Sequence, residues 1–302
     1  MKDKTNKKKK GLSLTMRQNL VGYSFILPNF IGFFIFIFIP VMFSLVLSFS
    51  HWDGFTEMEF AGLENFTDIF KDKVFVQSIW LTAYFSIFTV LFSMLASLGL
   101  ALLLNQKIKA RGFFRCALFF PYVASVVAIS VVWNAMLQPD YGPVNEFLKF
   151  IGIANPPGWL ASTDWVIPGL IIVNVWRNMG YFMIIYLAGL QNIDQSLYEA
   201  AEIDGAKGWA RFRKITWPLL SPSTFFVVMM LIINSFKVFD LVYLMTNGGP
   251  GTSSTMISQY IYNQAFISWD YGKSSAAAMI LFIIVALLTI FQFKAEKKIV
   301  NY

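Results

Sequence analysis

The chain has 302 residues, of which 57% are hydrophobic and only 14% are charged, and its net charge is +7. With a mean hydropathy of +0.59, this composition excludes an ordinary soluble domain and predicts an all-α polytopic membrane protein, because uncharged stretches repeatedly reach the roughly 20 residues that cross a bilayer. Cys116 is the only cysteine and His51 the only histidine, which excludes an intrachain disulfide and a Cys/His metal cluster, so no metal site is expected.

The first apolar stretch runs from Gly22 to Phe49. It is too long for the hydrophobic region of a secretory signal, and no small-residue cleavage site follows it. We therefore expect a retained anchor, with a basic tail over residues 1–20 before it. Residues 21–74 then comprise the first transmembrane helix and an extracellular loop.

Six transmembrane helices are expected in all. Four charge-free stretches lie between Arg17 and His51, from Val74 to Gln106, from Ala117 to Pro139 and from Ser274 to Phe293, and two further stretches, Trp165 to Leu190 and Leu219 to Met245, carry isolated charges. The second stretch exceeds one crossing, so we expect it to begin as an interfacial helix and to span the membrane from about Trp80 to Leu104.

Basic residues near the ends of the spans predict the orientation, because Lys and Arg resist translocation. They gather in the N-terminal tail, in the 105–116 loop and after the last span: Lys2, Lys4, Lys7, Lys8, Lys9, Lys10, Arg17, Lys107, Lys109, Arg111, Arg115, Lys294, Lys297 and Lys298. These segments, with both termini, are expected in the cytoplasm, while the acidic 51–73 and 138–164 loops face outward. The positive charge is thus a topology signal, and no nucleic-acid partner is expected.

The third cytoplasmic loop, residues 191–218, is long and balances four acidic residues with four basic ones. Ser196 is a candidate N-cap with Glu199 as its capping-box partner, so a short helix is expected to start there. Gly205 should bend the chain before a second amphipathic stretch from Trp209 to Ile215. On these grounds alone the loop could be an ordinary interfacial element.

The residue string in this loop resembles the EAA signature of ABC-importer permeases: YEAAEIDGA over residues 198–206, then Trp209, Phe212, Ile215 and Pro218-Leu219-Leu220-Ser221-Pro222. The resemblance implies a type I ABC-importer permease core over residues 75–294, with a coupling helix within 191–218 and a tail over 295–302. It also implies which residues couple to the ATPase: Tyr198, Glu199, Ala200, Ala201, Asp204, Gly205 and Ala206.

A second string after the fifth span is similar to the carbohydrate-uptake subclass of the maltose and glycerol-phosphate type, first permease: Phe239-Asp240, Thr246 to Pro250, Ser254-Thr255, Tyr260 to Tyr262 and Ala265-Phe266. This resemblance implies a bacterial or archaeal plasma-membrane complex with a second sugar permease, two cytoplasmic ATPase subunits and an extracellular solute-binding protein. The chain has no phosphate-cradling GxxxxGK[ST] motif, so it is expected not to be an enzyme and to hold no cofactor, with ATP and magnesium on the partner ATPase.

Ionisable groups inside spans are costly, so they mark a candidate substrate path. Arg177 shares a helical face with Asn174, Asn178 and Tyr181, and polar residues recur on the fifth span. The family resemblance adds Tyr122. The candidate path therefore consists of Tyr122, Arg177, Asn178, Tyr181, Asn234, Ser235, Lys237 and Asp240. Amides, hydroxyls and aromatic rings suit a neutral polyhydroxylated ligand.

Other interpretations of these residues remain. Lys237 and Asp240, three residues apart on one helix, could simply neutralise each other, and the Asn side chains could bond between helices. The chain could be an ion-coupled sugar symporter working alone, for which only Asp240 offers a coupling carboxylate. A membrane-embedded transferase is disfavoured, because no nucleophile and base cluster near the interface. The sequence leaves open which carbohydrate is carried, and whether a glycerol-phosphate ester is carried instead.

Overall fold

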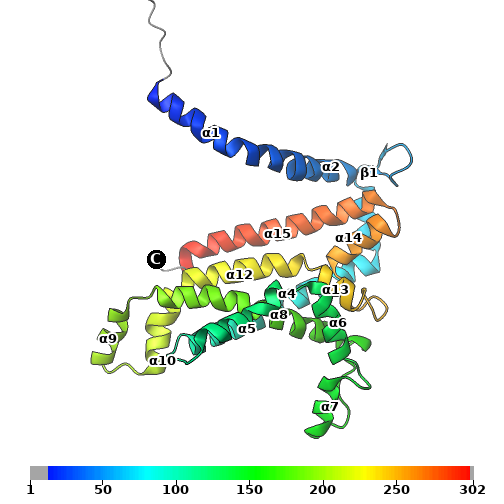
Figure 1. Ribbon diagram of the computed structural model, residues 1–302. Coiled ribbons are helices and arrows are strands. Elements are labelled where there is room, and N and C mark those ends of the chain that lie inside the picture. The colour runs from blue at the N-terminus through cyan, green and yellow to red at the C-terminus, as the bar shows by residue number, and fades with distance from the viewer. Residues whose placement is uncertain (1–12, 300–302) are drawn as a thin grey trace, which may run out of the picture.

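The computed structural model describes residues 13–299 as a bundle of long helices (Figure 1). The basic run from Lys2 to Lys10 lies outside the described residues. Four helical segments are long and apolar enough to cross a membrane, and the described part of the chain reaches six spans if each of two sharply bent helix pairs counts as one. The start of the first helix and the end of the last lie at the same end of the bundle (Figure 1), as an even number of crossings requires.

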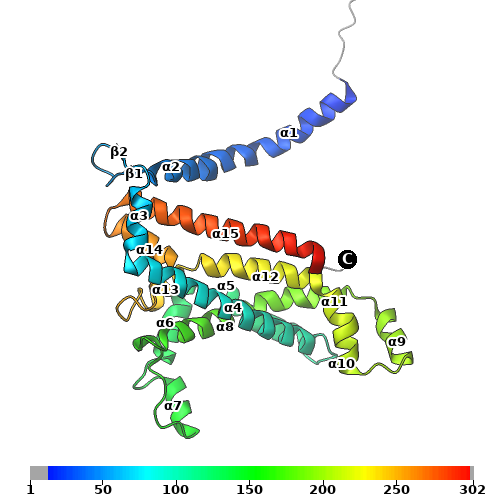
Figure 2. The ribbon, with the colours of Figure 1, turned by 180° about the vertical axis from the view of Figure 1, so that it is seen from behind.

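The N-terminal segment is a single apolar helical arm. It consists of α1 (Leu14–Phe33), a π-helical turn (Phe34–Phe38) and α2 (Ile39–Leu47). The π turn comes just before Pro40, whose ring prevents the regular helical hydrogen bond and forces the backbone to adjust. The arm meets α15 only near its α2 end, and α1 diverges from the bundle (Figures 1 and 2). The expected anchor is therefore a helix of spanning length.

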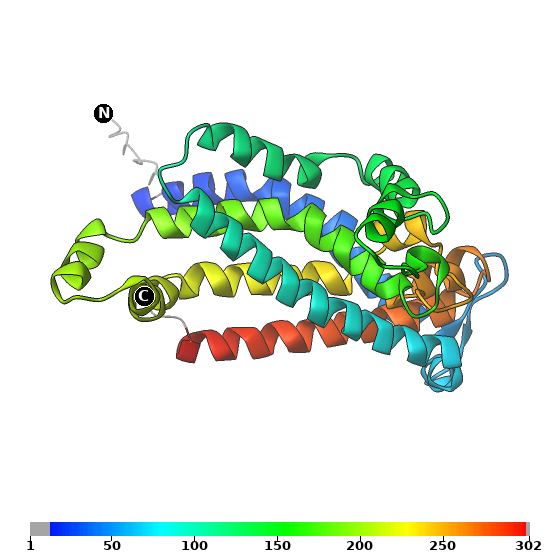
Figure 3. The same cartoon turned by 90° about the horizontal axis from the view of Figure 1, so that it is seen from below.

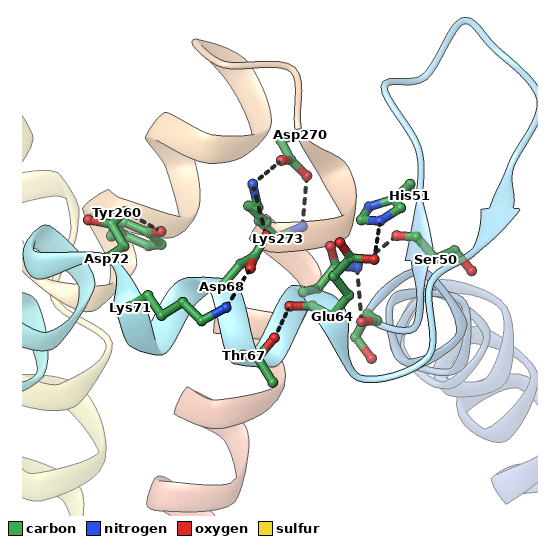
Figure 4. A network of polar contacts seen from close by, with 12 residues as sticks. Ser50, His51, Glu64, Thr67, Asp68, Lys71, Asp72, Tyr260, Asp270 and Lys273 are labelled. Atoms are coloured by element: carbon green, nitrogen blue, oxygen red, sulfur yellow. Dashed lines mark hydrogen bonds and ion pairs between the residues drawn. The ribbon is translucent and has the colours of Figure 1, made fainter.

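A small polar layer closes the end of the bundle where α2 stops. Strands β1 (Ser50–His51) and β2 (Glu59–Phe60) pair antiparallel, with Ser50 opposite Phe60, and α3 (Glu64–Lys71) follows. Figure 4 shows how Lys273, in the first turn of α15, reaches Asp68 at 3.8 Å and Asp270 at 3.5 Å. These contacts join α3 to the start of α15.

Helix α4 (Lys73–Leu104) is continuous over 32 residues. Asp72 caps this helix by accepting a hydrogen bond from the Val74 amide at 2.8 Å, so the stretch expected to begin at the interface and the span expected from about Trp80 belong to one continuous helix. One face of α4 is a buried row of small hydroxylated residues: Ser78, Thr82, Ser86, Thr89, Ser93 and Ser97. Small side chains let neighbouring backbones approach closely, and α4 crosses α8 and lies beside α12 (Figure 3).

The third expected span is not one straight helix. It divides into α5 (Arg111–Val123) and α6 (Val126–Met136), which meet at 97°. Beyond α6, helix α7 (Pro143–Phe150) and the 3-10 turn η2 (Trp159–Ala161) extend from the bundle at the end that carries β1 (Figure 1). Helix α8 (Val166–Gln191) then returns through the centre as its most buried long helix.

The second half of the chain leaves the bundle at the opposite end and comes back. Beyond α8 lie α9 (Gln195–Ile203), α10 (Gly208–Arg211), the π turn η3 (Phe212–Thr216) and α11 (Trp217–Leu219). The returning elements are α12 (Ser221–Phe236), α13 (Asp240–Met245), α14 (Ile257–Phe266) and α15 (Tyr271–Ile299). The fifth expected span is therefore interrupted between Phe236 and Asp240.

Candidate functional site

A polar pocket of about 230 Å³ lies where α5, the middle of α8 and the α12–α13 break meet. All of the expected path residues except Tyr181 line it: Tyr122, Arg177, Asn178, Asn234, Ser235, Lys237 and Asp240. The structure thus brings together residues that are up to 118 positions apart in the chain, as Tyr122 and Asp240 are. Asn174 also lines the pocket, on the helical face that the sequence predicts.

Two asparagines are fixed relative to each other on the α8 wall of the pocket. The Asn178 side-chain amide donates to the Asn174 backbone carbonyl at 2.9 Å and to the Asn174 side-chain oxygen at 2.6 Å. Asn174 is buried, with 6% of its surface exposed. The two amides therefore bond within one helix rather than between helices, and within the described part of the chain the Asn178 side-chain oxygen accepts no hydrogen bond.

Two tyrosine rings support the α5 side of the pocket. Tyr181 is outside the lining, but its ring stacks on that of Tyr122, with centroids 4.3 Å apart and planes 12° apart. The close approach of α5 to α8 depends on Gly180, because a Cβ there would overlap the Leu118 carbonyl oxygen. Tyr181 thus acts on the pocket through Tyr122 rather than by direct contact.

The break between α12 and α13 forms the third wall. Lys237 is the C-cap residue of α12, and Asp240 is the first residue of α13. Between them, Phe239 leaves the helical conformation, with φ −137° and ψ −60°. The expectation that Lys237 and Asp240 lie on one helix is therefore wrong, and no ion pair joins them among the described residues.

Ser235 has a narrower role than its residue type suggests. Its hydroxyl donates to the Ile232 carbonyl at 3.0 Å, within its own helix, so it faces the pocket only as an acceptor. Sequence reasoning also missed the apolar part of the lining, which comprises Leu231, Val238, Phe239 and Leu241. These residues resemble ordinary span residues, and only the position of the break shows that they face the pocket.

The second candidate site is the helical loop from α9 to α11, which precedes α12 and lies at the end of that helix away from the pocket. Helix α9 is capped by Asp194, whose carboxylate accepts from the Ser196 amide at 2.9 Å. The expectation of an N-cap at Ser196 is therefore wrong by two residues: the helix begins at Gln195, and the Asp194 carboxylate accepts from its second amide, that of Ser196. These hydrogen bonds lower the pKa of Asp194 below its ordinary value of 3.8.

Gly205 ends α9 as the sequence predicts. Its φ of +74° is left-handed, and the Ala206 amide bonds to the Ala201 carbonyl at 2.8 Å while the Gly205 amide bonds to the Glu202 carbonyl at 3.0 Å. This pair of bonds is the Schellman arrangement, in which glycine avoids the Cβ clash of the left-handed conformation. The chain thereby turns from α9 toward α10.

Side-chain contacts brace the two arms of the loop. The Tyr198 hydroxyl lies 2.9 Å from the Thr216 hydroxyl, and Arg211 lies 3.6 Å from Glu202. Trp209 and Phe212 stack with ring centroids 5.5 Å apart. The first two contacts hold α9 against the segment that leads into α12, and the ring stack lies within the second arm, so the loop is a braced unit.

The outer surface of the braced loop combines acidic and apolar groups. Glu199, Ala200, Asp204 and Gly205 are exposed, whereas Ala201 is buried and Tyr198 and Ala206 are partly buried. Ile203 is 88% exposed and Trp209 is 72% exposed. Sequence reasoning did not select Ile203, because a single apolar residue on a helical face is not in itself a signal of a partner.

Comparisons with known proteins agree over most of the chain. A family model described as "Binding-protein-dependent transport system inner membrane component" matches residues 75–301. The chain is similar to the lactose transport system permease protein of Rhizobium radiobacter, with 37% identity over 291 residues that cover 95% of this chain and 97% of that one. It is similar to the sn-glycerol-3-phosphate transport system permease protein of Agrobacterium fabrum, with 32% identity over 295 residues, 96% of this chain and 99% of that one.

The fold also matches a solved structure of a bacterial alginate ABC transporter in complex with an alginate pentasaccharide-bound periplasmic protein. The match has a TM-score of 0.83 and 25% sequence identity, and it covers 95% of this chain and 97% of that one.

Proposed function

The chain belongs to the family of inner membrane components of binding-protein-dependent transport systems, and from this premise we propose how it serves as a permease subunit of an ABC importer for carbohydrate. The observation that supports the proposal most strongly is the polar pocket at a break in an otherwise apolar span. Amides, a hydroxyl acceptor and an aromatic ring converge there, and these groups suit a sugar. Broken helices at such depth are where transporters bind their substrates.

The complete importer would contain this chain, a second sugar permease, two cytoplasmic ATPase subunits and an extracellular solute-binding protein. ATP and magnesium would bind to the ATPase subunits, and this chain would catalyse no reaction. Both termini and the braced loop would lie in the cytoplasm of a bacterial or archaeal plasma membrane. The basic residues at this end, Lys107, Lys109 and Arg111 among them, support this orientation.

The braced loop would receive the motion of the ATPase. Its exposed residues Glu199, Ile203 and Asp204 offer carboxylates and an apolar contact to a cleft in the partner. Because Tyr198 and Thr216 join the two arms, a displacement of α9 would move the segment that continues into α12. The far end of α12 is Lys237 at the pocket, so one helix would link the ATPase contact to the substrate site.

The test is uptake by the assembled complex in proteoliposomes. Saccharide should accumulate only with internal ATP and with the external binding protein present. Uptake by this chain alone, driven by a proton or sodium gradient, would instead establish an ion-coupled symporter and refute the proposal. Uptake by the same vesicles with and without internal ATP, in the presence of the binding protein, distinguishes the importer from the symporter.

A further inference from the structure

The pocket carries more positive than negative charge. Its ionisable lining consists of Arg177, Lys237 and Asp240, apart from a tyrosine. Resting on the function proposed above, we propose that the transported saccharide bears an anionic group, a carboxylate or a phosphate ester, which binds between Arg177 and Lys237. A neutral sugar would satisfy the amides of the pocket but would leave its cations without a counter-charge.

Neither cation is neutralised within the part of the chain that the structure describes. Arg177 and Lys237 take part in none of its ion pairs. The Arg177 Nε is buried and has no hydrogen-bond partner. An unpaired cation inside a membrane span is costly, and a buried donor without an acceptor adds the cost of its desolvation. An anion that enters the pocket removes both costs.

Asp240 does not serve as the missing partner. It stands in the first turn of α13, where the free amide groups of the helix favour a carboxylate. Lys237 stands at the C-terminal end of α12, where free carbonyl groups favour a cation. A helix end offers only partial charges, so Lys237 still lacks a counter-ion, and Arg177, in the middle of α8, has no helix end beside it. The net charge that a ligand meets is that of a cation.

The residue types match an anionic sugar rather than a bare ion. A guanidinium presents a planar fork of donors that fits a carboxylate or phosphate, and Lys237 adds a mobile ammonium group. Asn178, Asn234 and the Tyr122 ring lie in the same pocket for hydroxyls and a sugar face. Its volume of about 230 Å³ is below the approximately 300–1,000 Å³ of complete ligand sites. It therefore fits one charged sugar unit, and the second permease would contact the remainder.

The test uses three ring-matched probes: glucose, glucuronate and glucose 6-phosphate. Binding is measured by equilibrium dialysis on the assembled complex in lipid nanodiscs, without the external binding protein, so that only the membrane pocket selects. We expect at least one of the two anions to bind about ten-fold or more tightly than glucose, as a charge-assisted hydrogen bond allows. Comparison of the two anions identifies carboxylate or phosphate as the preferred group.

Charge variants supply the second arm. Lys237→Gln should remove about ten-fold of the anion affinity and leave glucose binding within about two-fold. Asp240→Asn should preserve or raise anion affinity, whereas a structural role for the charges would lower binding in both variants. Arg177→Lys should retain more anion affinity than Arg177→Gln. The matched control is Lys149→Gln, on the exposed helix α7, which should change nothing.

Glucose binding equal to that of both anions, with no effect of Lys237→Gln, would overturn the inference while leaving a carbohydrate permease. Failure of Lys237→Gln to assemble, with wild-type binding indifferent to ligand charge, would also overturn it, because the cation would then serve the subunit interface. If no saccharide binds and the complex imports a different class of solute, the proposed function itself fails.

Discussion

Replacement of Gly180 by alanine should damage transport without touching the substrate. A Cβ at this position would overlap the Leu118 carbonyl oxygen and lie 3.0 Å from the Phe119 Cα, whereas ordinary contacts begin at 3.4 Å. Both obstacles are backbone atoms of α5, so no side chain can rotate away. Helix α5 must move outward as a body.

The movement reaches the pocket because α5 carries Tyr122. That ring stacks on Tyr181, the residue next to Gly180, with a centroid separation of 4.3 Å. Overpacking of this kind costs about 1–3 kcal/mol. If that cost falls on the closed arrangement of the pocket, substrate affinity should drop by about five-fold to over a hundred-fold. Half-saturating substrate concentration in proteoliposome uptake, at equal protein content, measures the effect.

The matched control is Gly99→Ala in α4. It is also a glycine within a long helix, but nothing lies within 4 Å of an added Cβ. Gly99→Ala should therefore keep wild-type uptake and should keep or raise the unfolding temperature, because alanine favours a helix over glycine. Equal behaviour of the two variants would refute the close approach of α5 and α8. Loss of assembly in Gly180→Ala alone would place the cost on folding instead, which an unfolding curve of the purified complex distinguishes.

Three further predictions concern the loop and the pocket. Proline cannot adopt the φ of +74° at Gly205, so Gly205→Pro should abolish saccharide-stimulated ATP hydrolysis. Gly205→Ala should cost roughly 1–2 kcal/mol of local stability and should retain part of the stimulation. Equal activity of the two variants would count against the bend. Asn234→Ala should weaken uptake by about five-fold to over a hundred-fold through a lost contact of about 1–3 kcal/mol. Tyr181→Ala should weaken uptake indirectly, because it removes the ring on which Tyr122 stacks. Basal ATP hydrolysis should not change, and unaffected uptake in both variants would remove them from the path. The pKa of Asp194 is lowered in the fold, so the stabilisation by its cap is fully present above its ordinary pKa and is lost as the pH falls through the folded value. Acidification from about pH 6 to about pH 3 should therefore lower the unfolding temperature more in the wild type than in Asp194→Asn. Equal losses in the two proteins would contradict the cap.

The spans could be predicted from sequence because the bilayer imposes length and hydropathy. All but the last two residues of Gly22 to Phe49, and all of Ser274 to Phe293, fall in helices of spanning length. The bends could not be predicted in this way. The 97° angle between α5 and α6 occurs at Ala124-Ser125, two small residues in a charge-free run, and nothing in their hydropathy distinguishes them from helix. The two halves pack on different partners, α5 on α8 and α6 on α13, and these tertiary contacts are not visible in the local sequence.

The pocket was predictable as a set of residues but not as a shape. Ionisable side chains are energetically costly inside a membrane, which identified Arg177, Lys237 and Asp240 as candidates. Helical spacing predicted the polar face of α8. Lys237 and Asp240 are three apart, a spacing that also indicates a regular helix, so the sequence concealed the break between them. Phe239 lines the pocket only because that break exists. The contact between Tyr198 and Thr216 was equally hidden, since it depends on the turn at Gly205.

The break accommodates its two charges, which explains how an otherwise apolar span carries them. An interrupted helix in a membrane exposes carbonyl groups at one end and amide groups at the other, and neither set can rely on lipid for partners. Lys237 supplies a cation to the exposed carbonyl end of α12, and Asp240 supplies an anion to the exposed amide end of α13. The break itself lies in the backbone at Phe239, whose φ of −137° and ψ of −60° leave the helical conformation, so a neutral residue at either charged position should leave it open. An open break keeps Phe239 in the pocket beside Arg177.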